Sequence, residues 1–260
     1  MSIEILSKDN KRKKEVFLIK NKTPAFVNAL RRTVISLVPT MAINEVEFVK
    51  NSSALYDEIV ANRLGLIPLK TDLLSYELPS KCSCKGEGCA KCTLKIKLSA
   101  KGPCTVYAKD LVSTDPKVKP AFPDMPIVKL LERQEIEFIA TATLGIGIEH
   151  SKWSPGHVYY KGVPKIEIKG KCENPKEISD ICPKNIFKAS SSKLEINENK
   201  VMDCSLCLAC SNACESINIS ASNKDFCFSV ESFGQLEIKE IMDKAADIIV
   251  DMGEDLKKSL

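Results

Sequence analysis

Four cysteines are concentrated in residues 82–92, where their side chains could bind a metal ion. Cys82, Cys84, Cys89 and Cys92 follow the spacing C-x-C-x4-C-x2-C, and two glycines between them ease the turn. Four thiolates can complete a tetrahedral zinc site and leave no open coordination position, so such a site would be structural. Two local disulfides or free thiols are the alternatives for the same residues.

A second cysteine pattern lies further along the chain. Cys204, Cys207, Cys210 and Cys214 have the spacing C-x2-C-x2-C-x3-C, which is typical of iron–sulfur proteins of the bacterial ferredoxin type. In such proteins three thiolates of a run bind one cluster, and the fourth binds the other cluster. A cluster on this run therefore needs its last ligand from elsewhere in the chain.

The same spacing, moved upstream, identifies a donor for that cluster. It falls on Cys172, Pro175, Ile178 and Cys182, and Pro183 follows as in the C-P ending of a ferredoxin run. This upstream run lacks two of its ligands, so only one cluster can form. We predict that its ligands are Cys182, Cys204, Cys207 and Cys210. The cluster would be [4Fe-4S], or [3Fe-4S] if Cys182 does not bind; a zinc site or disulfides are the alternatives.

Two cysteines remain outside both predicted sites in this region. Cys172 and Cys214 would be neighbours in a ferredoxin-like fold, where they are either free or joined as a disulfide. Glu215 stands where a proline would complete the downstream run, which is a departure from the pattern.

The sequence contains no recognisable pattern of catalytic residues. Glu149 and His150 could serve as bases, but no serine or cysteine nucleophile and no carboxylate pair accompanies them. No glycine-rich dinucleotide motif occurs either. We therefore predict no catalytic residues in this chain.

Composition describes a globular intracellular protein. The 260 residues are 44% hydrophobic and 28% charged, and the net charge of +4 does not by itself indicate nucleic-acid binding. The start of the chain lacks a signal-peptide pattern and no apolar run approaches ~20 residues, so a soluble, cytoplasmic protein is expected. In that reducing compartment 12 cysteines indicate metal binding, although hyperthermophiles do form intracellular disulfides.

The elements that position these residues can be predicted from periodicity. A helix should begin at Pro24, with Thr23 as its N-cap, and end before Pro39. A strand over 41–49 and a helix from 52 or 53 to 65 should follow. Further strands are expected at 3–6, 16–19, 94–98, 105–108, 134–148 and 226–230, and a helix from 235 to the end.

Four stretches of the chain resemble one known family. They are Ala-Leu-Arg-Arg-Thr at 29–33, Ala-Asn-Arg-Leu-Gly-Leu-Ile-Pro-Leu at 61–69, Glu-His-Ser-Lys-Trp-Ser-Pro at 149–155 and Val-Glu-Ser-Phe-Gly at 230–234. The chain resembles the assembly platform of cellular RNA polymerases, a family that includes the bacterial alpha subunit, the third-largest subunit of eukaryotic RNA polymerase II and the D subunit of archaeal DNA-directed RNA polymerase. Eukaryotic members carry a similar cysteine-rich loop, and some archaeal members carry a ferredoxin-like insertion.

This resemblance implies a role in assembly and not in chemistry. The chain would pair with a small, like-folded, L-like subunit, and the heterodimer would dock the two large catalytic subunits, with DNA met only through the complex. Polymerisation needs metal-bound carboxylates, and no aspartate-rich run of that kind occurs. The alternative function is a ferredoxin-type electron carrier or a redox-sensing iron–sulfur protein.

Partner contacts are expected on two surfaces. The dimer interface should use apolar residues of the first and last helices, namely Phe26, Leu30, Val34, Ile241, Ile248 and Met252. Ordinary packing within the chain is an equally good explanation of the last helix. By resemblance, large-subunit contacts fall on Arg31, Arg32, Arg63 and Trp153.

The expected fold class is α+β with three parts. Residues 1–39 and 225–260 form a discontinuous dimerisation domain of strands and amphipathic helices. Residues 40–165 form an inserted, mostly β domain that includes the loop 82–92. Residues 166–224 form a small ferredoxin-like domain.

Overall fold

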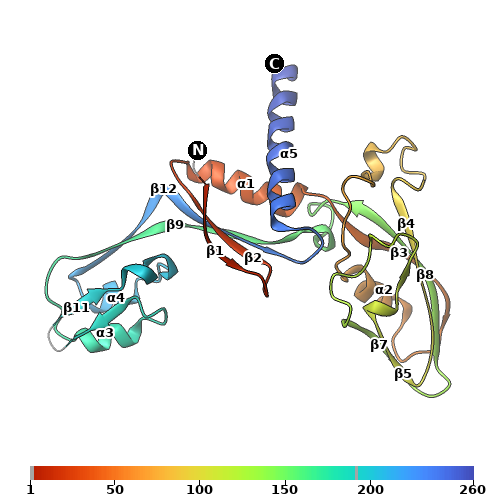
Figure 1. The fold of residues 1–260 in the computed structure, drawn as a ribbon, viewed down its shortest axis with the longest axis horizontal. Helices are drawn as coiled ribbons and strands as arrows, with labels where there is room; N and C mark the ends of the chain where they lie inside the picture. Colours follow the sequence, from red (N-terminus) through yellow and green to blue (C-terminus); the bar gives the residue numbers. More distant parts are fainter. Residues whose placement is uncertain (1–2, 191–192) are drawn as a thin grey trace. The chain divides into compact units, whose positions relative to one another are not determined.

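The computed structural model describes residues 3–190 and 193–260, which fold as two compact units (Figure 1). The first unit contains the N-terminal segment up to Lys8, Val16–Asn28 and Tyr159–Ser229. The second contains Asp9–Glu15, Ala29–Val158 and Val230–Leu260. Both mix helices with antiparallel strand pairs, in agreement with an α+β class. The three-domain division proposed from the sequence stays a prediction.

A four-stranded sheet forms the centre of the second unit. Its order is β3-β8-β4-β6, with β3 at Thr40–Asn51, β8 at Glu135–Gly145, β4 at Thr93–Lys101 and β6 at Val112–Ser113. Along β8, alternate residues from Ile136 to Leu144 are buried, the period-2 pattern of a strand with one buried face. A two-stranded sheet of β5 (Cys104–Tyr107) and β7 (Pro126–Leu130) accompanies it.

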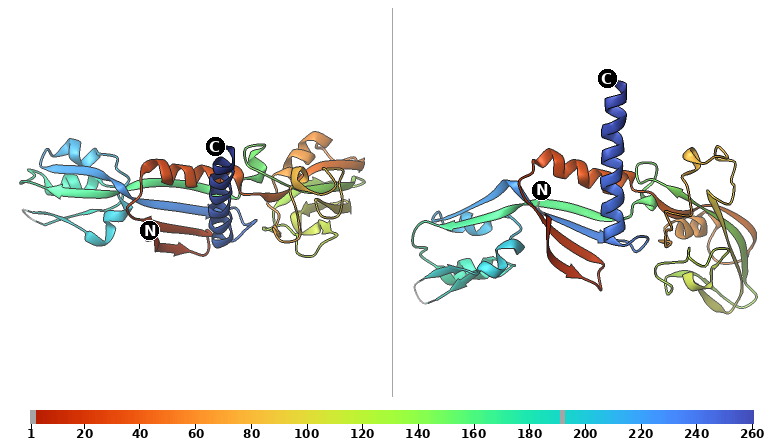
Figure 2. Two further views of the ribbon diagram at one scale, coloured as in Figure 1. Left: turned by 90° about the horizontal axis from the view of Figure 1, so that it is seen from above. Right: turned by 45° about the horizontal axis from the view of Figure 1, so that its top comes forward.

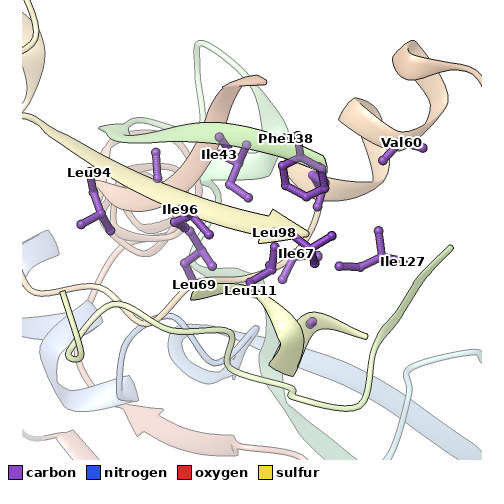
Figure 3. Packing of buried hydrophobic residues seen from close by; sticks show 14 of the residues in the cluster. Ile43, Val60, Ile67, Leu69, Leu94, Ile96, Leu98, Leu111, Ile127 and Phe138 are labelled. Atoms are coloured by element: carbon purple, nitrogen blue, oxygen red, sulfur yellow. The ribbon is translucent and has the colours of Figure 1, made fainter. Parts of the chain in front are cut away.

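The core of the second unit fills the space between this sheet, α2 (Asp57–Gly65) and the strand β7 (Figure 3). Phe138 is almost completely buried and meets Phe48 edge to face, with ring centroids 5.7 Å apart. Val60 of α2 and Ile127 of β7 belong to the same cluster. The segment 61–69 therefore has a structural role, because Leu64, Ile67 and Leu69 all contribute to this core.

A second four-stranded sheet has the order β1-β2-β12-β9. Its strands are β1 (Ile3–Asp9), β2 (Lys14–Ile19), β12 (Ile217–Ser232) and β9 (Gly156–Ile168). Sequence periodicity did not predict β9, which contains two glycines and a proline, and it predicted only the last part of β12. Both strands are long and neighbouring, so the polypeptide between them is an insertion.

That insertion belongs to the first unit and coincides with the segment predicted to be a ferredoxin-like domain. It begins where Lys169 N–H donates to the Ser216 carbonyl at 2.8 Å. Figure 2 shows its small elements gathered at the end of β9 and β12. They are α3 (Pro175–Ile181), β10 (Phe187–Ala189), β11 (Leu194–Ile196) and α4 (Ala209–Ala213).

Short 3-10 helices occur in both units. They lie at Pro79–Lys81, Ala108–Asp110, Ser151–Trp153 and Glu198–Asp203.

The first predicted helix is confirmed as α1, Pro24–Leu37. Thr23 caps it, since the Phe26 N–H donates to Thr23 Oγ1 at 3.3 Å. Val27, Leu30 and Val34 are buried along one stripe, as helical spacing predicts.

The last helix, α5, runs from Ile238 to Ser259 and begins three residues later than predicted. A capping box fixes this start, because the Glu237 N–H donates to the Glu240 carboxylate at 2.9 Å. Ile241 and Ala245 are fully buried, but every residue after Asp251 is exposed. Figure 1 shows the C-terminal turns of α5 projecting away from the rest of their unit. No helix in the described part of the chain is long and apolar enough to cross a membrane.

Truncating the core of α1 should destabilise the chain. Leu30 is only 5% exposed, so Leu30→Ala removes buried methyl groups and leaves a cavity. We expect the free energy of unfolding to fall by about 2–5 kcal/mol, measured by urea denaturation. Ala29→Ser, at an exposed position of the same helix, is the matched control and should change stability by less than about 0.5 kcal/mol. An unchanged midpoint for Leu30→Ala would contradict the burial.

Candidate metal centres

The four cysteines of residues 82–92 converge on one point. Their sulfur atoms all lie within 4.8 Å of one another. Individual separations are 3.5 Å for Cys82–Cys89 and for Cys82–Cys84, 3.4 Å for Cys84–Cys92 and 3.9 Å for Cys89–Cys92. Zinc–sulfur bonds of about 2.3 Å place the ligands of a tetrahedral site about 3.8 Å apart. The thiols therefore fit a single tetrahedral metal ion, and none of them forms a disulfide.

Two tight turns bring these thiols together. Lys85 N–H donates to the Cys82 carbonyl at 2.9 Å, and Cys92 N–H donates to the Cys89 carbonyl at 3.0 Å. Between the turns Gly86 and Gly88 have φ of 87° and 94°, which is left-handed backbone that glycine adopts without a steric cost. The loop leads directly into β4, which begins after Cys92.

The thiols of this site differ in acidity. Hydrogen bonds from the Cys89 backbone N–H and from Cys92 lower the pKa of Cys84 to about 5. Burial, together with the neighbouring thiols, raises the pKa of Cys92 to about 12. One thiolate is therefore available at neutral pH, while the other sulfurs release protons when a metal binds.

The second group of cysteines surrounds a small enclosed cavity in the first unit. Its sulfur-bearing walls are Cys182, Cys204, Cys207 and Cys210, the four residues predicted to hold a cluster. Its remaining walls are mainly apolar: Ile166, Pro183, Ile186, Phe187, Leu208 and Ile219. The arrangement thus brings together two segments that the sequence separates by more than twenty positions.

The spacing of this group differs from that of the first. Among the described residues, Cys82, Cys84, Cys89 and Cys92 form the one set with ligand atoms within 4.8 Å of one another. The thiols around the cavity are not part of such a compact set. A cluster distributes its cysteine ligands over several iron atoms, so a wider set of thiols around an apolar cavity fits an iron–sulfur cluster better than zinc.

The loop from Cys204 to Cys210 has an unusual backbone. Leu206 and Leu208 have φ of 60° and 61°, a left-handed conformation that costs a non-glycine residue about 1–2 kcal/mol. Successive turns of this kind direct backbone N–H groups into a concavity, an arrangement found at iron–sulfur sites. The Ala209 backbone N–H and the Ser205 hydroxyl lower the pKa of Cys207. Burial is the main cause that raises the pKa of Cys210.

Lys161 of β9 fixes the start of this loop. Its ammonium donates to the Met202 carbonyl at 2.7 Å and to the Cys204 carbonyl at 2.6 Å. Sequence reasoning missed this lysine, because nothing distinguishes it from the other basic residues of a lysine-rich chain. The two left-handed leucines were missed for a similar reason, since leucine is not a residue that indicates such backbone.

The other two cysteines between residues 172 and 214 form a disulfide. Cys172 and Cys214 are joined, with Cα atoms 5.9 Å apart, so of the two alternatives left open the structure has the bonded one. Cys172 precedes α3 and Cys214 follows α4. Since Cys182 follows α3 and Cys210 lies in α4, the disulfide ties together the ends of two helices that position cavity cysteines.

Several residues proposed as partner contacts have roles within the chain. Trp153 is only 8% exposed, and its indole N–H donates to the Thr143 carbonyl at 3.2 Å. The ring lies against Gly145, where an added Cβ would be 2.3 Å from it. Trp153 thus packs within its own unit, and its role as a partner contact stays a prediction. Arg63 donates to the Pro126 carbonyl at 2.7 Å, while Arg32 is exposed. Roles for Arg31, Arg32 and Arg63 in partner contacts stay predictions.

The predicted dimer residues divide in the same way. Leu30, Val34 and Ile241 are buried in the chain itself, and their part in a dimer interface stays a prediction. Phe26 and Ile248 are half-buried, and Met252 is 57% exposed. The interface prediction therefore depends mainly on Phe26, Ile248 and Met252, which remain partly accessible.

Comparison with known proteins agrees with the motifs described above. Residues 41–157 match the model of the RNA polymerase Rpb3/RpoA insert domain. The chain is 38% identical to DNA-directed RNA polymerase subunit Rpo3 of Methanosarcina acetivorans over 260 residues, which cover 98% of this chain and 97% of that protein. It is 38% identical to Rpo3 of Archaeoglobus fulgidus over 258 residues, or 98% and 96% of the two chains. Rpo3 of Pyrococcus horikoshii is 42% identical over 180 residues, or 69% and 67%. The chain therefore belongs to the family of the archaeal DNA-directed RNA polymerase subunit Rpo3.

Proposed function

We propose that this protein is a non-catalytic assembly subunit of a DNA-dependent RNA polymerase, equivalent to the D subunit of the archaeal enzyme. The observation that carries the proposal is similarity to Rpo3 proteins along nearly the full length of both chains. An isolated electron carrier is not favoured, because its cluster would need only the insertion and not the surrounding sheets and helices. In the cytoplasm the protein would meet DNA only through the complete enzyme.

The surface that supports pairing is the outer half of α5. Ile241, Ala245, Ile248, Met252 and Leu256 follow one another at helical spacing and make a single stripe. The first two are buried by this chain, whereas Met252 and Leu256 are 57% and 61% exposed. A stripe that continues past its own core needs another apolar surface to cover it. The small, like-folded L-type subunit is the partner we propose, with the resulting heterodimer docking the two large catalytic subunits.

Two cofactors are part of this proposal. The cavity lined by Cys182, Cys204, Cys207 and Cys210 would hold one iron–sulfur cluster, [4Fe-4S] or, without Cys182 as a ligand, [3Fe-4S]. The compact thiol group of residues 82–92 would hold one zinc ion. In each site four cysteine ligands leave no coordination position open. Both metal centres would therefore act by holding the fold together.

A tagged pull-down from the source organism tests the assembly role. We expect the wild-type chain to recover two large subunits and a small one. Met252→Asp should lose most of the small subunit, because a carboxylate replaces an exposed apolar contact. Glu254→Ala, at a neighbouring exposed position of α5, is the matched control and should recover all partners.

The melting temperature of the isolated variants separates pairing from folding. Met252 is exposed, so the Met252→Asp variant should have the same melting temperature as the wild type. Recovery of the wild-type chain alone, or with a reductase in place of polymerase subunits, would refute the assembly role. Full recovery of the small subunit by Met252→Asp would instead move the interface away from α5.

A further inference from the structure

A small polar pocket lies within the second unit where two of the sequence motifs meet. It has a volume of about 240 Å³ and opens to solvent. Asn62 and Leu66 come from the motif at 61–69, and His150 and Lys152 come from the motif at 149–155. Asn44 of β3 completes its polar lining. We call it the Lys152 pocket.

Lys152 brings a positive charge to this pocket without a matching negative one. Its ammonium donates to the Asn44 Oδ1 at 2.8 Å and to the Ile43 carbonyl at 3.2 Å, and it lies 4.4 Å from the centre of the Trp153 ring. These are neutral partners, and no ion pair of Lys152 occurs among the residues that the structure describes. Burial lowers the pKa of Lys152. A partly desolvated ammonium of this kind gains most from a carboxylate that approaches it.

The other polar groups of the pocket also offer hydrogen-bond donors. His150 Nδ1 accepts the Lys152 backbone N–H at 3.0 Å, so a neutral imidazole carries its proton on Nε2. The edge-to-face contact of His150 with Trp153, at 6.4 Å between centroids, holds the ring in place. Asn62 adds an exposed amide on α2. An ionised carboxylate is the side chain that only accepts hydrogen bonds, and it matches this set of donors.

The size of the pocket favours a side chain over a metabolite. Sites for small molecules usually measure about 300–1,000 Å³, so this pocket is small for one. Leu66 is 54% exposed at its edge, and an exposed leucine beside a donor-lined pocket is typical of a protein contact surface.

We propose that the Lys152 pocket receives an aspartate or glutamate side chain of a large polymerase subunit. This inference rests on the proposed assembly function and adds to it one contact and its chemistry. The charge pair would fix the register of docking, since it satisfies an ammonium that the isolated chain leaves without a counter-charge.

Zero-length cross-linking of the assembled polymerase tests the contact directly. A carbodiimide activates a carboxyl group, which then forms an amide with a lysine amine in contact with it, with loss of the activating group as a urea. We expect mass spectrometry to find Lys152 joined to an aspartate or glutamate of a large subunit. Cross-links from other lysines of this chain with none from Lys152 would overturn the proposal.

Two substitutions measure how much the pocket contributes to assembly. Asn62→Asp keeps the side-chain size and adds a negative charge. That charge repels an incoming carboxylate or forms an ion pair with the Lys152 ammonium. Asn10→Asp, in an exposed turn of the same unit, is the matched control. We expect Asn62→Asp to weaken retention of the large subunits about tenfold in a salt titration, and Asn10→Asp to leave it unchanged.

Lys152→Met is the complementary variant, and its melting curve shows whether the loop of residues 149–155 has stayed folded. Retention of the large subunits equal to wild type by both Asn62→Asp and Lys152→Met would overturn the pocket while leaving the assembly role intact. Failure of the wild-type chain itself to assemble would remove the proposed function and this inference with it. Excess acetate should also weaken retention of the large subunits by the wild-type protein, which would support a carboxylate ligand. Equal weakening by chloride would oppose a carboxylate ligand.

Discussion

Cys210→Ser is expected to abolish cluster binding and to unfold the insertion between β9 and β12. Cys210 is 5% exposed and belongs both to the thiol wall of the cavity and to the hydrophobic core around it. Among the residues that the structure describes, that core contains six buried ones: Ile178, Ile186, Phe187, Cys204, Cys210 and Ile217. A core this small does not stabilise a domain of this size without an additional cross-link such as a metal centre.

Two measurements on anaerobically purified protein check this result. Wild-type protein should be brown and contain iron and inorganic sulfide, and Cys210→Ser should be colourless. Hydrogen exchange should become fast from α3 to α4 and stay slow in β8 of the other unit. Cys227→Ala is the matched control, because Cys227 is a buried thiol of the same unit that does not line the cavity. Slow exchange of α3 and α4 in colourless Cys210→Ser would show that the insertion folds without its cluster.

Cys92→Ser should remove the metal from the compact thiol site. Cys92 is fully buried and lies 3.4 Å from Cys84 and 3.9 Å from Cys89, so no other side chain can replace its sulfur. Substitution of groups that only orient ligands lowers metal affinity about 10–100-fold, and loss of a ligand should exceed that range. Apparent zinc-binding free energies in small zinc domains are about 10–16 kcal/mol, which makes this one of the largest local energies in the molecule.

Competition with a coloured chelator measures the affinity of this site. The wild-type chain should retain one zinc ion, and Cys104→Ser should behave identically, because Cys104 is an exposed thiol of the same unit outside the group. Affinity should rise with pH, since Cys92, with its pKa raised to about 12, must lose a proton to bind. Equal zinc retention by Cys92→Ser and wild type would mean that the thiols are not the ligands.

The two groups of cysteines could be recognised from the sequence because most of the information is local. Ligands in residues 82–92 and 204–210 are only a few positions apart, so the spacing alone limits what they can enclose. The fourth thiol of the cavity, Cys182, is distant in sequence, but the repeat of the ferredoxin spacing identified it. The structure places it on the wall of the same cavity.

The sequence is least informative where tertiary contacts decide the outcome. Periodicity identifies the apolar face of α1 or α5, but it does not say whether this chain or another one covers that face. A lone tryptophan beside a motif suits an interface, but the sequence does not indicate that Trp153 also packs on Gly145 within the chain. Lys152 and Lys161 show the same limit, because their importance comes from distant carbonyl groups that they reach in the fold.

The insertion that contains the cavity enters and leaves its sheet at a single point. Lys169 and Ser216 are hydrogen-bonded at 2.8 Å, at the ends of the neighbouring strands β9 and β12. A hairpin turn of a few residues would join those two ends equally well. Evolution can therefore lengthen, shorten or exchange this module without displacing either strand. Lineages that differ in iron supply or oxygen exposure can keep, simplify or discard the cysteines inside it independently of selection on the rest of the protein.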